Sequence, residues 1–370
     1  MRPEPTAEQA ELKVAVREFL SREITQERLL AWENDPVGAP AEMRRALAEL
    51  GWLGLGVPVD AGGSGAPLVD VACLVEECAR GLLPRPLTSA IRGAVALGDV
   101  APGARALAVV GQGERSVALA LDEAAASRPE RYATTVSADG GGAVVRGVKS
   151  FVPDADASDL HLVAAREGSG VSLVLVDRHG RGVTTEPVRS FGGDRQAHVT
   201  YAAAPVVERL SKPGEGAAAL ALLQRRQTAL ALAEMVGGMA AVLDMTVAYV
   251  KEREQFGQKI AIFQAVRHQV ADMGTRATAA RHLAWQAITR ISSGSEQGHE
   301  LATAVAYVGQ AFKQICWAGH HLHGGAGFVV EHRLRFHSER AQSLCIRYTP
   351  EAPALAEIAS ALLDADAARA

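Results

Sequence analysis

The chain has 370 residues, of which 48% are hydrophobic and 22% are charged. This length suits two or three packed units, and the apolar content lies far above the disordered range. The net charge of −4 gives no electrostatic case for a nucleic-acid partner, which would need a basic face. Neither an uninterrupted apolar run of about eighteen residues nor a secretory signal pattern is present, so we expect a cytoplasmic protein with no membrane partner.

The first zone, residues 1–112, is expected to form an N-terminal helical domain. Apolar residues recur at spacings of three and four over residues 6–30, which predicts one long helix. Residues 41–50 predict a second helix that a glycine ends, and residues 68–79 predict a third. A glycine-rich loop, GLGVPVDAGGSG, lies between them at residues 54–65.

The second zone, residues 113–212, has a different texture. Short runs such as SVALAL, GAVVRGVKSFV and VSLVLV have the composition of strands and are separated by polar breaks. The segment from Asp139 to Gly142 is a hairpin-loop signal between two of these runs. Strands at this spacing, with no helices between them, predict a small antiparallel sheet or barrel.

The third zone, residues 213–370, is helical again. Long helical patterns cover residues 217–252, interrupted only by Gly237-Gly238, and then 263–291 and 296–321, followed by an alanine-rich final segment from residue 338. Long helices joined by short turns favour an antiparallel four-helix bundle. We therefore expect a mainly α protein with a central antiparallel β-domain.

Two segments between long helices carry candidate chemistry. Residues 253–259 (REQFGQK) place cations beside an aromatic ring, and an exposed arginine there could bind phosphate; an ordinary charged loop is the alternative. Residues 320–328 (HHLHGGAGF) combine histidines with glycines that let a backbone approach a ligand; a simple glycine helix cap is the alternative. His320 and His323 have a metal-ligand spacing but no accompanying carboxylate, so we predict no metal site.

Several classes of protein lose their usual sequence support. No GxSxG elbow, Walker loop, HExxH motif or GxGxxG after a strand is present. The four cysteines have no CxxC spacing and are too few for a disulfide framework, which predicts reduced and mostly buried thiols.

Taken together, five segments resemble the acyl-CoA dehydrogenase family. The resemblance is most specific in EREQFGQKIAIFQAVRHQVADM (252–273) and HLHGGAGFVVEHRLRFHSERA (321–341), which look like the two C-terminal signatures of that family. RGVKSFVPDADASDLHLVAA resembles its middle β-domain, and WLGLGVPVDAGGSG and VEECARGLLPRPL resemble its N-terminal helical domain. The resemblance covers essentially the whole chain and implies an acyl-CoA dehydrogenase-like fold.

The resemblance also implies a reaction, the FAD-dependent α,β-dehydrogenation of an acyl-CoA thioester. A glutamate removes the α-proton, the β-hydride moves to the flavin, and an acceptor of the electron-transfer flavoprotein type takes the electrons. In the family, residues of the two signatures reach the FAD of a neighbouring subunit. Carried over, these cofactor-binding residues are Arg253, Gln255, Phe256, Gln264, His321, Gly324 and Gly325.

In the family, each subunit also provides residues for its own FAD, and this chain matches that part of the pattern poorly. The family has a glycine-rich loop where this chain has LDEAAASRPE, residues 121–130, without glycine. The family's Trp-x-Thr beside the flavin corresponds here to Phe151 and Pro153. Proline has neither a hydroxyl nor an N–H, so Pro153 cannot donate a hydrogen bond to the flavin.

The catalytic base of the family is also missing. Its two possible positions correspond to Gln227 and Tyr348, and neither side chain is a good base at neutral pH. Glu234 and Glu351 lie near these positions in the sequence, but packing or surface roles are favoured for both. We therefore assign no catalytic residue to this chain.

One hypothesis explains both departures. The chain would be the non-catalytic member of a heterotetramer, lending its half-site to a paralogous acyl-CoA dehydrogenase subunit that supplies the base, with the FAD shared across the subunit interface. Hetero-oligomers of this kind in the family include ones that act on steroid side chains; fatty acids are the other substrate class. Two alternatives stay open: a self-sufficient homo-oligomeric dehydrogenase or oxidase-like flavoenzyme with a non-standard base, and a structural paralogue that binds neither FAD nor substrate.

Overall fold

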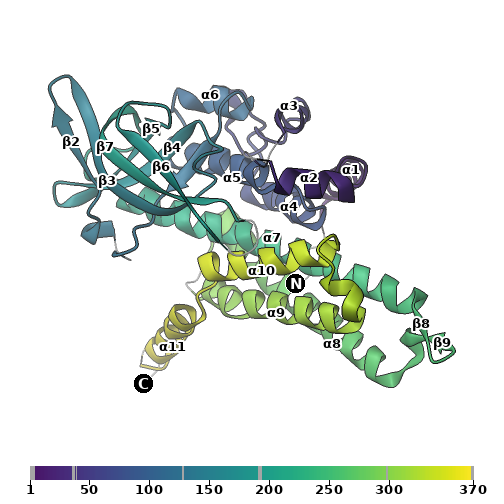
Figure 1. The fold of residues 1–370 in the computed structure, drawn as a ribbon. Coiled ribbons are helices and arrows are strands. Elements are labelled where there is room, and N and C mark those ends of the chain that lie inside the picture. The colour runs from purple at the N-terminus through teal and green to yellow at the C-terminus, as the bar shows by residue number, and fades with distance from the viewer. Residues whose placement is uncertain are drawn as a thin grey trace. The chain divides into compact units, whose positions relative to one another are not determined.

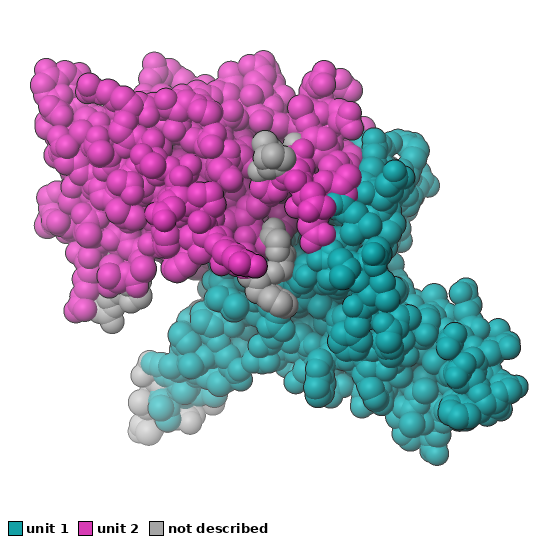
Figure 2. Space-filling view, in the orientation of Figure 1, with its two compact units in different colours: residues 1–30, 68–83, 228–370 teal, residues 31–67, 84–227 magenta. Residues whose placement is uncertain are grey.

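The computed structural model describes residues 5–35, 38, 40–126, 129–190, 194–296 and 299–367. The chain divides into two compact units, coloured separately in Figure 2. Unit 1 comprises residues 1–30, 68–83 and 228–370, and unit 2 comprises residues 31–67 and 84–227. Two helices, α2 (Gln26–Glu33) and α7 (Ala217–Glu252), have residues in both units.

Unit 2 is built on a seven-stranded sheet. Its strands are β1 (Val117–Ala120), β2 (Thr135–Asp139), β3 (Gly142–Pro153), β4 (Leu160–Glu167), β5 (Gly170–Asp177), β6 (Val183–Val188) and β7 (Gln196–Arg209). The order β4-β2-β3-β7-β5 returns to β4 because β5 also pairs with β4, so these strands close into the predicted barrel. The hairpin predicted at Asp139–Gly142 is confirmed, since these two residues pair across the β2–β3 turn.

The pairing in this sheet differs from the expected antiparallel order at one strand. Both β1 and β2 pair with β4 in parallel, whereas β4 and β5 are antiparallel. A parallel pair needs a long connection, and the chain between β1 and β4 supplies one because it includes the β2–β3 hairpin. The other unit 2 helices are α3 (Ala41–Glu49), α5 (Arg85–Val100) and α6 (Ala106–Gly111), with short 3₁₀ turns η1 (Val59–Ala61) and η2 (Pro129–Arg131).

Unit 1 is helical. It contains α1 (Ala7–Glu23), α4 (Leu68–Arg80), α8 (Gln264–Ser293), α9 (Glu300–His323), α10 (Arg333–Tyr348) and α11 (Glu351–Ala367), the hairpin strands β8 (Glu254–Gln255) and β9 (Gln258–Lys259), and the 3₁₀ turns η4 (Ile260–Ile262) and η5 (Gly324–Phe328). Helix α9 contacts α8, α10 and α11, and Figure 1 shows the β8–β9 hairpin at one end of this bundle, where α7 passes into α8.

Two predicted helices are split in the structure. The helix predicted over residues 6–30 is wrong as a single element, because the carbonyl of Ile24 accepts a hydrogen bond from Arg333 (3.0 Å) and the Thr25 hydroxyl caps the start of α2. The final segment likewise begins earlier than residue 338, at α10, and is divided before Pro350, whose ring cannot continue a helix.

Helix α7 is 36 residues long and apolar enough to cross a membrane by length and composition. In its most apolar stretch, however, 61% of the residues are buried inside the protein. This burial is typical of a core helix. Helix α7 confirms the long helical pattern predicted over residues 217–252 and runs through Gly237-Gly238 without a break.

The two glycines of α7 allow close helix packing instead of ending the helix. A Cβ atom at Gly237 would overlap the carbonyl oxygen of Glu76 on α4, and one at Gly238 would overlap the ring of Phe312 on α9. Glycine therefore lets α7 approach both neighbours at backbone distance. This close approach explains why a helix-disfavouring pair is tolerated in the middle of a long helix.

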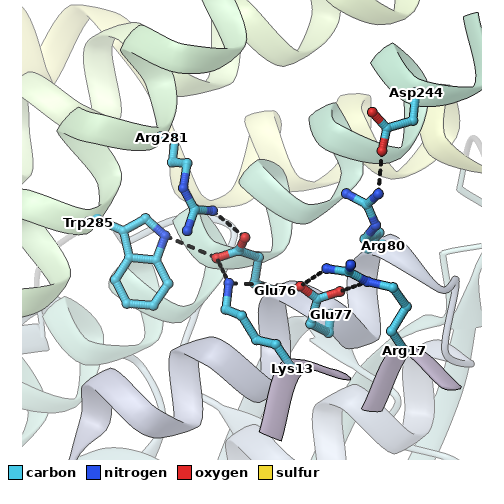
Figure 3. A network of polar contacts seen from close by, with 8 residues as sticks. All are labelled: Lys13, Arg17, Glu76, Glu77, Arg80, Asp244, Arg281 and Trp285. Carbon is cyan, nitrogen blue, oxygen red and sulfur yellow. Dashed lines mark hydrogen bonds and ion pairs between the residues drawn. The ribbon is translucent and has the colours of Figure 1, made fainter. Parts of the chain in front are cut away.

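Buried carboxylates on α4 tie the helices of unit 1 together (Figure 3). The Glu76 carboxylate lies 2.9 Å from the Lys13 ammonium on α1, accepts a hydrogen bond from the Trp285 indole on α8 (3.0 Å), and pairs with Arg281 on the same helix. Its side chain is only 6% exposed, so its charge depends on these partners rather than on water.

Two further charged residues of α4, Glu77 and Arg80, also form ion pairs with other helices (Figure 3). Glu77 accepts two hydrogen bonds from the Arg17 guanidinium on α1, at 2.9 and 3.1 Å. Arg80, one turn further along α4, pairs with Asp244 on α7. Helix α4 thus forms ion pairs with α1, α7 and α8.

We expect Gly237→Ala to destabilise the protein. The added methyl group would meet the Glu76 carbonyl, and overpacking of this kind costs about 1–3 kcal/mol. The matched control is Gly274→Ala in the middle of α8, where a Cβ meets nothing within 4 Å. That control should gain up to about 1 kcal/mol from helix propensity. Urea denaturation of both variants measures the difference, and equal midpoints would contradict the packing argument.

Candidate functional site

The β8–β9 hairpin presents an aromatic ring on a strained turn. Glu254 pairs with Lys259 and Gln255 with Gln258, which leaves Phe256 and Gly257 as the turn. Both turn residues have positive φ, 54° and 75°, and the Phe256 side chain is 90% exposed. A bulky residue rarely adopts positive φ, so the strained and exposed ring indicates a functional constraint.

The base of the hairpin is held firmly while Arg253 is left available. The Lys259 ammonium contacts the Glu254 carboxylate (2.8 Å) and the Glu252 carbonyl (3.0 Å). Within the described residues, the exposed Arg253 side chain makes no hydrogen bond or ion pair, and only its backbone is bonded. A free guanidinium on a rigid hairpin suits an anionic group.

A groove of about 860 Å³ runs between α8, α9 and η5. Its floor includes two hydrogen-bonded pairs, His321 with Gln269 (3.0 Å) and Arg276 with Gln314 (3.0 Å). Gly324 and Gly325 lie at its end, and a Cβ at either position would meet nothing within 4 Å. Their backbone groups are therefore open to a bound molecule.

The structure places all seven cofactor-binding residues expected from the sequence in unit 1, and all are exposed. Arg253, Gln255 and Phe256 lie together on the hairpin, and Gln264 begins α8. His321, Gly324 and Gly325 lie together in the groove, so the set falls into two groups. Sequence reasoning missed Trp317 and Arg276 of the groove; the spacing of Trp317 and His321, one turn apart on the same helix, was the available signal.

Among the histidines beside these glycines, His323 is buried, His320 is half-buried and His321 is exposed. His323 bonds the Gly319 carbonyl through Nδ1 (2.8 Å) and stacks on Tyr249 at a centroid distance of 4.4 Å. Burial lowers the pKa of His320, His323 and His332, so these imidazoles stay neutral. In the described part of the chain, no group of three or more His, Cys, Asp or Glu side chains could hold a metal ion.

The loop after β1 in unit 2 is held by a buried ion pair. Lys149 has a fully buried side chain that contacts the Glu123 carboxylate (2.9 Å) and lies 3.6 Å from the Tyr132 ring centroid. Burial lowers the pKa of Lys149 to about 8, although the bond to Glu123 opposes this. Glu123 also accepts the backbone N–H groups of Ala133 (2.7 Å) and Thr134 (3.1 Å). Residues 127 and 128 of the segment 121–130, which replaces the family's glycine-rich loop, lie outside the described part of the chain.

The end of β3 carries the residues that replace the family's Trp-x-Thr. Phe151 has positive φ (54°), is 42% exposed and packs on His198 at a centroid distance of 5.1 Å. Pro153 ends the strand and is followed by Asp154, which is buried and accepts a hydrogen bond from Ser89. Burial raises the pKa of Asp154 to about 6, with the Ser89 bond opposing.

Gln227 is locked in a buried pair with Arg92 on α5. Arg92 Nε donates to Gln227 Oε1 (2.9 Å), Arg92 Nη2 donates to the Gln227 carbonyl (2.8 Å), and Gln227 Nε2 donates to the Arg92 carbonyl (3.1 Å). Gln227 is only 3% exposed, and both ends of its amide are bonded. The side chain is therefore a structural link between α5 and α7 and takes up no proton.

The other residues considered as bases lie elsewhere. Tyr348 is half-buried at the end of α10, and Glu234 is buried on α7. Glu351 is exposed at the start of α11 and accepts a hydrogen bond from Gln310 (2.7 Å).

Three family models match successive parts of the chain between residues 6 and 347. The acyl-CoA dehydrogenase N-terminal domain matches residues 6–99, the middle domain 118–202 and the C-terminal domain 215–347. Among curated proteins, the probable acyl-CoA dehydrogenase FadE25 of Mycobacterium tuberculosis is 26% identical, over 88% of this chain and 87% of the relative. Benzylmalonyl-CoA dehydrogenase of Aromatoleum aromaticum is 29% identical, over 80% and 82%.

Solved structures agree with these matches. A single-residue variant of the Tcur3481-Tcur3483 steroid ACAD superposes with a TM-score of 0.87 at 28% identity, covering 97% of this chain and 99% of that one. The expected fold is thereby confirmed, as a mainly helical protein with a central β-domain and C-terminal helices. The chain belongs to the acyl-CoA dehydrogenase family, whose members are FAD-dependent oxidoreductases acting on CH–CH bonds.

Proposed function

We propose that this chain is the base-lacking subunit of a heteromeric acyl-CoA dehydrogenase, lending half of an FAD site to a catalytic partner subunit. The observation that carries the proposal is the contrast between two sets of residues. The set that would serve a neighbouring subunit is exposed, whereas Gln227, at a base position of the family, is locked by Arg92. In a chain that had simply lost its function, both sets of residues would have diverged from the family pattern to the same extent.

The exposed residues of unit 1 fit part of a flavin dinucleotide. Arg253 offers an unpaired guanidinium for a phosphate, and Gly324 and Gly325 leave room for a backbone approach. Phe256, fully projecting from the turn, offers an apolar contact. This chain's part is then to bind and orient the cofactor, because none of these side chains can act as a base at neutral pH.

The residues of unit 2 do not fit the remaining part. The loop after β1 has alanines in place of glycines and is tethered through Glu123 and Lys149. Pro153 has no hydrogen to donate, and the amide of Gln227 is fully engaged. No step of dehydrogenation is therefore assigned to this chain's own unit 2. The partner, a paralogous acyl-CoA dehydrogenase subunit, would supply the base and the other contacts to FAD.

The family and one similar solved structure support the substrate class that we propose. We propose an acyl-CoA thioester, with an acceptor of the electron-transfer flavoprotein type, in a cytoplasmic heterotetramer. The structure named as a steroid ACAD joins two gene products in its name and is 28% identical to this chain. This likeness favours a bulky steroid side chain as the acyl group over a simple fatty acid.

We expect the chain expressed alone to contain little flavin, and co-expression with the paralogous subunit to restore it. In that complex, Arg253→Ala should weaken FAD binding about tenfold or more, because a charge-assisted hydrogen bond is worth about 1.5–3 kcal/mol. The measurement is the flavin-to-protein absorbance ratio after dilution and dialysis.

The matched control is Arg146→Ala, since Arg146 is exposed but pairs with Asp139 on its own hairpin (3.1 Å). This control should retain flavin. A flavin-containing and active protein from the chain expressed alone would contradict the shared-site proposal. Unchanged flavin occupancy in Arg253→Ala would also contradict it.

We expect Gln227→Glu to leave the chain inactive by itself. Arg92 would pair with the new carboxylate and favour its ionised form, so the base would be neither mobile nor of suitable pKa. Gln227→Leu removes the amide instead, and the broken buried hydrogen bonds should cost about 1–3 kcal/mol.

The activity of Gln227→Glu is measured by dye reduction with acyl-CoA substrates, and the stability of Gln227→Leu is measured by its denaturation midpoint. Substrate-dependent activity of Gln227→Glu without a partner would favour the self-sufficient alternative.

A further inference from the structure

The groove between α8, α9 and η5 contains one unusually placed side chain. Trp317 lies on α9 and lines the groove, yet it is 81% exposed. An indole ring is a large apolar surface with one polar edge, and tryptophan is enriched where proteins contact other molecules. By contrast, Trp52 and Trp285 are buried, at 6% and 5% exposure.

The position of Trp317 relates it directly to the glycines of the proposed FAD site. Trp317 and His321 are four residues apart on α9, so they lie on one face of the helix, and Gly324 follows the last residue of α9 as its cap. The six helical steps from Trp317 to His323, the last residue of α9, rise about 9 Å. This length is comparable with that of the adenosine diphosphate half of a dinucleotide.

Hydrogen-bonding groups flank the indole. The two bonded pairs across α8 and α9, Gln269 with His321 and Arg276 with Gln314, bracket the stretch that holds Asp272 on α8 and Trp317 on α9. Asp272 lies 4.0 Å from the Arg276 guanidinium and keeps acceptor capacity. An aromatic face with amide and carboxylate groups at its edge suits a purine, which has a flat ring, an amino group and ring nitrogens.

We infer that Trp317 is the stacking residue for the adenine ring of the shared dinucleotide, with the phosphates directed toward Gly324 and Gly325. This inference rests on the proposed function, because it names a further binding residue of the same half-site. It predicts that adenine, and not the phosphates alone, depends on the indole.

The test uses the purified full-length chain and two probes, ADP and inorganic pyrophosphate, each titrated by isothermal calorimetry. Trp317→Ala should weaken ADP binding about tenfold, within the range for base–aromatic stacking, and leave pyrophosphate binding unchanged. Trp317→Phe keeps an aromatic face and should recover most of the ADP affinity. The matched control is Ile346→Ala on α10, which is 82% exposed but does not line the groove.

A spectroscopic readout accompanies the titration. ADP should quench tryptophan fluorescence in the unsubstituted chain, because the exposed indole would be covered, and this quenching should disappear in Trp317→Phe. The inference is overturned if the unsubstituted chain does not bind ADP, or if Trp317→Ala leaves ADP binding intact. It is also overturned if that variant weakens pyrophosphate equally, or if it only disrupts subunit assembly in gel filtration, which would make Trp317 a protein contact.

The outcome is separable from that of the proposed function. Flavin loss in Arg253→Ala combined with an unaffected Trp317→Ala would reject the adenine contact and retain the shared FAD site. If ADP binding depends on Trp317 while Arg253→Ala retains its full flavin content, the shared FAD site would be rejected and the adenine contact at Trp317 would be retained.

Discussion

The carboxylate of Glu76 is the point on which the packing of unit 1 depends. It takes its partners from α1 and α8, while its own backbone carbonyl is the surface against which Gly237 of α7 packs. A buried carboxylate is costly unless every lone pair finds a donor, so these helices are held in one arrangement rather than several. Helices α8 and α9 line the groove and α7 and α8 carry the hairpin, so both rest on that arrangement.

Rigid packing inside unit 1 contrasts with what the unit exposes. The hairpin holds an exposed Phe256 in a strained conformation, and the groove leaves Trp317 and two glycines open. Two candidate positions of unit 2 have the reverse character, since Gln227 and Glu123 are bonded to buried partners of their own chain, although Phe151 of the same unit also has positive φ and is 42% exposed. Exposed side chains without hydrogen-bond partners can bind another molecule, whereas side chains whose hydrogen bonds are all made within the chain contribute to the stability of the fold. This distinction, more than the identity of any one residue, supports a subunit that helps a partner to hold a cofactor.

A subunit of this kind also explains why a base position could change to glutamine without loss of the fold. The amide and carbonyl oxygens of Gln227 accept charge-assisted hydrogen bonds from the Arg92 guanidinium, so α5 and α7 stay joined without a buried carboxylate. Binding energy and chemistry are then divided between chains: this one would contribute orientation and contact area, and the partner the proton transfer. The groove around Trp317 extends that contact area beyond the residues that the family resemblance names.

The sequence by itself determined the family, the order of helical and strand-rich zones, the hairpin at Asp139–Gly142 and the candidate residues on the β8–β9 hairpin, because these depend on local pattern and short motifs. Tertiary structure decided the rest. Gly237-Gly238 interrupts the apolar pattern in the sequence, but in the structure both glycines are packing contacts within a continuous helix. The break at Ile24 depends on a hydrogen bond from Arg333, more than three hundred residues away. The pair of Gln227 with Arg92 and the exposure of Trp317 arise only when distant helices meet, and contacts of that kind leave no periodic signal in the chain.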